Sequence, residues 1–128
     1  MTGNEYQRLA LTTLNPALSE REVLINGVMG LCGESGEAID LVKKHLSQGH
    51  ELDREKLAME LGDVAWYLAE TAYAIGYDLD TVLQMNLDKL KARYPAGFDA
   101  ARSKNRPNES CKEPLHLSSG GGVQPIIK

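Results

Sequence analysis

Apolar residues recur at helical spacing along most of the chain, and no segment shows the apolar–polar alternation of a half-buried strand. The pattern therefore predicts helices alone. Four are expected, over residues 5–14, 20–48, 54–75 and 79–94. Because the connections between them are short, the sequence predicts an all-α fold, a four-helix bundle.

Residues that cap helices mark the expected boundaries. Ser19 followed by Glu22 is a capping box, and Asp53 and Asp78 are N-caps for the third and fourth helices. Gly49 supplies a C-terminal stop for the second helix. Each cap agrees with the apolar periodicity that follows or precedes it.

The composition changes after Gly97. The segments "SKNRPNESCKEP" and "HLSSGGGVQP" are rich in Ser, Pro, Gly, Asn and charge, with little to bury. We therefore expect a helical domain over residues 1–97 and an irregular polar tail over residues 98–128.

Charge and length narrow the classes of function. The net charge of −4 argues against binding driven by phosphate-backbone neutralisation, so no nucleic acid partner is expected. The chain lacks a basic leader and an apolar run of about 18 residues, so no membrane span is expected. Cys32 and Cys111 form neither a disulfide framework nor a zinc spacing, and a reduced, cytoplasmic setting is expected.

The stretch "NGVMGLCGESGEAIDLVKK" joins an unusual glycine content to a pair of carboxylates. It holds Gly27, Gly30, Gly33 and Gly36. Each glycine inside a helix costs about 1 kcal/mol relative to alanine. Glu34 and Glu37, one turn apart, share a side of the helix with Gly27 and Gly30. Two explanations stay open: the glycines make room for a ligand, or they let another helix approach closely.

The third expected helix carries a second acidic pair. Glu60 and Asp63 lie along one edge of its apolar stripe, and Tyr67 continues that edge. The stripe consists of Leu57, Leu61, Val64, Leu68 and Ile75. Antiparallel helices would bring E-x-x-E and E-x-x-D face to face, and four carboxylates would repel unless cations lay between them. Hard divalent ions, Mg²⁺ or Mn²⁺, suit such oxygen ligands. The alternative is two ordinary solvated acidic faces.

Basic and amide side chains complete the candidate site. Lys44 lies on the Glu37 side of the second helix. On the fourth helix, Asn86, Lys89 and Arg93 line the flank of an apolar stripe that we expect to be buried. That stripe consists of Leu79, Leu83, Leu87, Leu90 and Tyr94. Such a row suits polyphosphate oxygens, although a solvated basic face would look the same.

Three segments, "GESGEAIDLVKK", "MELGDVAWYLA" and "NLDKLKARYP", resemble the MazG-like all-α nucleoside triphosphate pyrophosphohydrolases. The resemblance covers roughly residues 5–95. It implies Mg²⁺-dependent hydrolysis of a nucleoside triphosphate between the α and β phosphates, giving a monophosphate and pyrophosphate in nucleotide-pool sanitation.

The resemblance also implies roles for individual residues. Glu34, Glu37, Glu60 and Asp63 would hold the metal, and Glu34 or Glu37 would position a water or take its proton. Lys44, Lys89 and Arg93 would stabilise charge on the triphosphate. Candidates for holding the base are Trp66, Tyr67, Asn26 and Gln7, and Tyr67 is preferred because it shares the acidic edge.

Trp66 is expected to serve another purpose. With Met59 and Tyr73 it forms a second apolar patch, on nearly the opposite side of the third helix. A helix that is apolar on two sides indicates a helix contact or a subunit contact. We therefore expect a homodimer or homotetramer.

Two other functions could also use glutamates on facing helices. A di-iron bundle needs two E-x-x-H motifs, and the chain offers one, Glu113 to His116 in the tail, so this class is set aside. A non-enzymatic helical dimer, whose acidic groove binds a structural ion or a basic partner, stays open.

Overall fold

Helices make up most of the structure, a computed structural model that describes residues 1–105. In this range no strand is formed, and the expected all-α class is confirmed. The elements are α1 (Gly3–Ala10), the 3₁₀ turn η1 (Leu11–Thr13), α2 (Glu20–Gln48), α3 (Arg54–Ala74), α4 (Leu79–Arg93) and α5 (Ala100–Lys104). None of the helices in residues 1–105 is long and apolar enough to cross a membrane.

The expected caps are confirmed. The Ser19 side chain accepts from the Glu22 amide at 3.3 Å, and the Glu22 carboxylate accepts from the Ser19 amide at 2.8 Å. Asp53 and Asp78 accept hydrogen bonds from the amides three residues on, at 2.9 and 2.7 Å. Gly49 ends α2 with a left-handed φ of 72°. Short-range chemistry therefore fixes the ends of the long helices.

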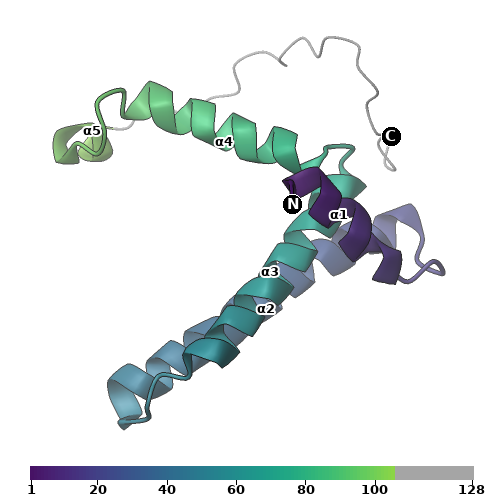
Figure 1. Ribbon diagram of the computed structural model, residues 1–128, viewed down its shortest axis with the longest axis horizontal. Coiled ribbons are helices and arrows are strands. Elements are labelled where there is room, and N and C mark those ends of the chain that lie inside the picture. The colour runs from purple at the N-terminus through teal and green to yellow at the C-terminus, as the bar shows by residue number, and fades with distance from the viewer. Residues whose placement is uncertain (106–128) are drawn as a thin grey trace.

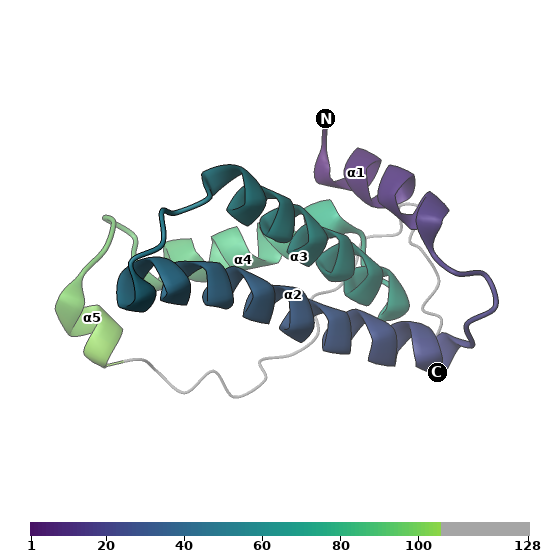
Figure 2. The same ribbon diagram turned by 90° about the horizontal axis from the view of Figure 1, so that it is seen from below.

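α2 and α3 form a long antiparallel hairpin, the two helices lying side by side in both views (Figures 1 and 2). Two of the glycines of α2 lie directly against residues of α3. A Cβ at Gly27 would lie 2.6 Å from Thr71 Oγ1, and a Cβ at Gly30 would overlap the Tyr67 ring. By contrast, Gly33 and Gly36 have open space around them. Close helix packing therefore explains two of the four glycines.

α1 is tied to the end of the hairpin by a buried amide. Gln7 Nε2 donates to the carbonyls of Ala69 and Tyr77 at 3.0 and 3.2 Å, and its Oε1 accepts from the Leu79 amide at 3.1 Å. Gln7 was a candidate for holding a base, but in this structure its side chain joins α1 to the end of α3 and the beginning of α4.

Trp66 makes the helix contact that its patch predicted. Its indole Nε1 donates to the Ala10 carbonyl at 3.1 Å and to Thr13 Oγ1 at 3.0 Å. α1 and η1 are therefore held against α3 at two points along its length.

The closed four-helix bundle is not what the structure shows. The described residues form five α-helices, and α4 leads away from the α2–α3 hairpin (Figure 1). In the apolar stripe expected to be buried, Leu79 is 6% exposed, but Leu83, Leu87 and Leu90 are 46%, 49% and 39% exposed. The spacing correctly predicted an amphipathic helix, but spacing alone does not say what covers its apolar side.

α5 lies inside the segment expected to be irregular. Asp99 caps this five-residue helix, its side chain accepting from the Arg102 amide at 2.9 Å. The remainder of the expected tail, with its single E-x-x-H match, lies outside the described residues. The domain division at residue 97 stays a prediction.

The two kinds of glycine in α2 should respond oppositely to alanine. Gly30→Ala should lower the free energy of unfolding by about 1–3 kcal/mol, because its methyl group would overlap the Tyr67 ring. Gly33→Ala is the matched control, and it should raise that free energy by up to about 1 kcal/mol, since the site is open. Urea denaturation followed by circular dichroism would measure both. Equal effects of the two substitutions would contradict the packing role of Gly30.

Candidate metal centre

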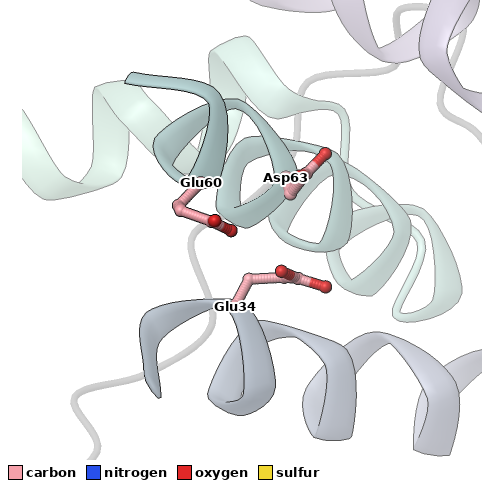
Figure 3. Close-up of side chains that lie close together, drawn as sticks. All are labelled: Glu34, Glu60 and Asp63. Atoms are coloured by element: carbon pink, nitrogen blue, oxygen red, sulfur yellow. The ribbon is translucent and has the colours of Figure 1, made fainter. Parts of the chain in front are cut away.

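Three carboxylates from two helices meet across the hairpin. Glu34 of α2 points toward α3, where Glu60 and Asp63 lie one turn apart (Figure 3). One carboxylate oxygen from each residue lies within 4.8 Å of the other two. Glu34 and Glu60 are half-buried and Asp63 is exposed, so the cluster opens to solvent on one side.

The packing of α2 against α3 brings these carboxylates together. Glu34 follows Gly30 by one turn on the same side of α2, and Tyr67 follows Asp63 by one turn on α3. The Tyr67 ring lies over Gly30, and the two helices run antiparallel. Asp63, one turn before Tyr67 on α3, therefore lies opposite Glu34, one turn after Gly30 on α2. The register that the glycine contact fixes therefore brings the carboxylates together.

The cluster is electrostatically costly without a cation. The pKa of Glu34 is raised above its ordinary value, first by desolvation and then by the charges of Asp63, Glu60 and Glu37. Each of these effects disfavours the ionised carboxylate. A hard divalent ion would reverse this balance, and a few carboxylates with water filling the other positions is how proteins hold Mg²⁺. The donor set therefore fits Mg²⁺, and Mn²⁺ as well.

Glu37, the fourth expected ligand, lies beside the cluster. It is exposed, and its charge acts on Glu34. One turn further on, Asp40 forms salt bridges with both Lys43 and Lys44. These lysines lower the pKa of Asp40 to about 2. Lys44, expected to bind substrate, is therefore engaged by Asp40 and is also influenced by Glu37.

The aromatic candidates lie next to one another on α3. The rings of Trp66 and Tyr67 meet edge to face, with centroids 5.0 Å apart. Tyr67 is half-buried, and its ring occupies the space that the missing side chain of Gly30 leaves. It therefore lies between the two helices, one turn from Asp63 of the acidic cluster.

The expected basic row lies on a different arm of the molecule. Asn86 and Lys89 are exposed and Arg93 is half-buried, all on α4. Because α4 leads away from the hairpin (Figure 1), a single chain does not bring this row to the cluster in the way that it brings Glu34, Glu60 and Asp63 together.

A buried carboxylate, Glu70, was missed by the sequence reasoning. Its side chain is fully buried, and Asn26 Nδ2 donates to both of its oxygens at 3.0 Å. Burial raises the pKa of Glu70, and the hydrogen bond from Asn26 acts in the opposite direction. The sequence held one signal for Glu70: it follows Asp63 by two helical turns, which places it on the same side of α3 as the acidic pair. The amide nitrogen of Asn26, a candidate for holding a base, is engaged by Glu70.

Comparisons with known proteins find a family model and a relative that match the chain. Residues 26–98 match the model of the MazG nucleotide pyrophosphohydrolase domain. A relative, the Gene 37 protein of Mycobacterium phage L5, is 42% identical over 82 residues, which cover 61% of this chain and 72% of that protein. No solved structure matches the chain. The cluster and the α4 row both lie within the segment that matches the family.

Loss of the Asn26 amide should destabilise the protein in a pH-dependent way. Because burial raises the folded-state pKa of Glu70, ionised Glu70 costs stability above that pKa, and the cost falls as the pH drops toward the ordinary value of 4.5. Asn26→Ala should therefore lower the free energy of unfolding by about 1.5–3 kcal/mol at pH 7, and by less at pH 5.

Urea denaturation at both pH values would measure this effect. The double variant Asn26→Ala, Glu70→Gln is the control, because the neutral glutamine that replaces Glu70 does not titrate. A loss of the same size at pH 5 and pH 7 in the single variant would contradict an ionised Glu70.

Removing one charge from the cluster should stabilise the metal-free protein and weaken its binding of Mg²⁺. Glu34→Gln removes a carboxylate that its neighbours and desolvation disfavour, so it should raise the melting temperature of the metal-free protein at pH 7. It should also abolish most of the further rise that Mg²⁺ gives the wild-type protein, since ligand binding stabilises the folded state. Thermal melts with and without Mg²⁺ would test this, with exposed Glu51→Gln as control. A metal response unchanged in Glu34→Gln would argue against the site.

Proposed function

The chain belongs to the MazG nucleotide pyrophosphohydrolase family, and from this premise we propose that it hydrolyses nucleoside triphosphates between the α and β phosphates. The products are a nucleoside monophosphate and pyrophosphate. The cluster of Glu34, Glu60 and Asp63 carries the proposal, because it lies within the matched segment and offers oxygen ligands for Mg²⁺.

In this proposal the carboxylates have two roles, metal binding and activation of the attacking water. Glu34, Glu60 and Asp63 hold Mg²⁺, which when bound neutralises phosphate charge and lowers the pKa of a bound water. Glu37 is exposed beside them, and it positions the attacking water or accepts its proton. Glu34 is the alternative base.

Substrate binding uses the side chains around the cluster. Tyr67 contacts the base, since it lies on α3 one turn from Asp63 of the cluster. Lys44 contacts the phosphates, which requires it to exchange Asp40 for a phosphate oxygen. Asn86, Lys89 and Arg93 bind the polyphosphate as hydrogen-bond donors, and the charges of Lys89 and Arg93 offset that of the leaving group. The activity would remove unwanted nucleotides from the cytoplasmic pool, in a homodimer or homotetramer.

The products test the proposal directly. A panel of ribonucleoside and deoxyribonucleoside triphosphates is incubated with and without Mg²⁺, and the products are separated by anion exchange. We expect monophosphate and pyrophosphate in equal amounts, and only with the metal. Glu37→Gln should lower kcat by about 100-fold or more if this carboxylate acts on the water, while Glu51→Gln should leave it unchanged.

Other outcomes would contradict cleavage between the α and β phosphates. Diphosphate and inorganic phosphate would mean attack at the γ phosphate and would overturn the proposed bond. An absence of any product, together with an Mg²⁺-dependent rise in melting temperature, would favour the non-enzymatic reading in which the groove holds a structural ion.

A further inference from the structure

A cavity of about 560 Å³ lies at the end of the hairpin where α1 packs beside the beginning of α4 (Figure 1). Leu11, Leu14 and Tyr73, all half-buried, form its apolar walls, and the buried side chain of Gln7 also lines it. Pockets that bind small molecules have volumes of this order, and their walls are mostly apolar with a few polar groups. The cavity is therefore large enough for a small organic ligand.

The cavity is separate from the acidic cluster. Tyr73 follows Asp63 by ten residues on α3, which is about 15 Å along the helix axis. Leu11 marks the cavity side of the N-terminal segment. Tyr6 lies on another side of α1, where its hydroxyl donates to the Gly62 carbonyl, next to the cluster, at 3.4 Å. A molecule in the cavity therefore does not occupy the candidate metal centre.

The buried amide of Gln7 has no free hydrogen-bonding group for a ligand. Its nitrogen already donates to the carbonyls of Ala69 and Tyr77, and its oxygen accepts from the Leu79 amide. The half-buried side chains around it are two leucines and a tyrosine ring. This part of the cavity therefore favours an apolar group.

Asp78 gives the cavity a fixed negative charge. Its carboxylate accepts from the Thr81 amide at 2.7 Å. Hydrogen bonds from Thr81, first from its amide, and from the Asn4 side chain hold the pKa of Asp78 below its usual value, although desolvation acts in the opposite direction. Asp78 is therefore ionised at neutral pH, and like-charge repulsion disfavours a ligand with several negative charges, such as a triphosphate.

Arg8 supplies a single positive charge at the open side of the cavity. It is exposed and lies one turn along α1 from Asn4. Within residues 1–105 its guanidinium forms no salt bridge and donates no hydrogen bond. A guanidinium binds a carboxylate through two parallel hydrogen bonds. One anionic group of a ligand can therefore pair with Arg8.

We propose that this cavity binds a small organic monoanion with an apolar body, such as an aromatic carboxylate. The carboxylate pairs with Arg8, and the ring packs against Leu11, Leu14 and Tyr73. Because these residues come from α1, from η1 and the loop after it, and from α3, the bound ligand links three parts of the fold and stabilises the folded chain. The binding site does not rest on the proposed function.

NMR of the full-length, nitrogen-labelled protein tests the site and the class of ligand. Phenylpropionate should shift the amide signals of Leu11, Thr12 and Asp78 in a saturable way and leave those of Glu34 and Glu60 unchanged. Neutral phenylpropanol and cationic phenethylamine should bind about tenfold more weakly, because neither can pair with a guanidinium as an anion does. Saturable shifts confined to other parts of the chain, or none, would overturn the site. Equal or tighter binding of the alcohol or the amine would overturn the class of ligand.

Substitution of Arg8 tests the charge pair. Arg8→Gln keeps a hydrogen-bond donor but removes the charge, so it should weaken phenylpropionate binding about tenfold or more. Its melting temperature without ligand should equal that of the wild type, since Arg8 forms no salt bridge within the described residues. Arg21→Gln is the matched control, because Arg21 is exposed and does not line the cavity. Equal phenylpropionate affinities in the two variants would overturn the role of Arg8.

Discussion

The close approach of α2 and α3 at Gly27 and Gly30 is the contact on which the rest of the structure depends. Thr71 and Tyr67 occupy the space that these glycines leave, and this fit sets the register of the two long helices. The same register places Glu34 opposite Glu60 and Asp63. Glycine lowers helix propensity by about 1 kcal/mol per position, and in exchange it fixes the geometry of the site.

The hairpin also places ionisable groups where they cost stability. Glu34 is destabilised in its ionised form by desolvation and by its neighbours, and Glu70 by burial. The chain compensates for the two carboxylates in different ways. Asn26 donates hydrogen bonds to both oxygens of Glu70, so the buried carboxylate has its hydrogen-bond donor within the chain. Glu34 has only other carboxylates around it in the cluster, so a cation from outside the chain would be needed to stabilise its ionised form.

The sequence predicted local features well because short-range chemistry determines them. The Ser19 capping box, the Asp53 and Asp78 caps and the Gly49 stop need only neighbours along the chain, and the pairing of acidic motifs needs only helical periodicity and antiparallel packing. The direction of α4 was not predictable in this way, since it depends on tertiary hydrogen bonds such as those of Gln7. The buried Glu70 was missed for the same reason, because its donor comes from another helix.

The acidic cluster lies on the hairpin and the basic residues Lys89 and Arg93 lie on α4, and this separation has a physical consequence. Asp40 shows what occurs when lysines lie one turn from a carboxylate on the same helix, since both Lys43 and Lys44 pair with it. A lysine in that position beside Glu34 would neutralise the cluster and compete with a divalent ion for its oxygens. Cations on α4 avoid this competition within a single chain.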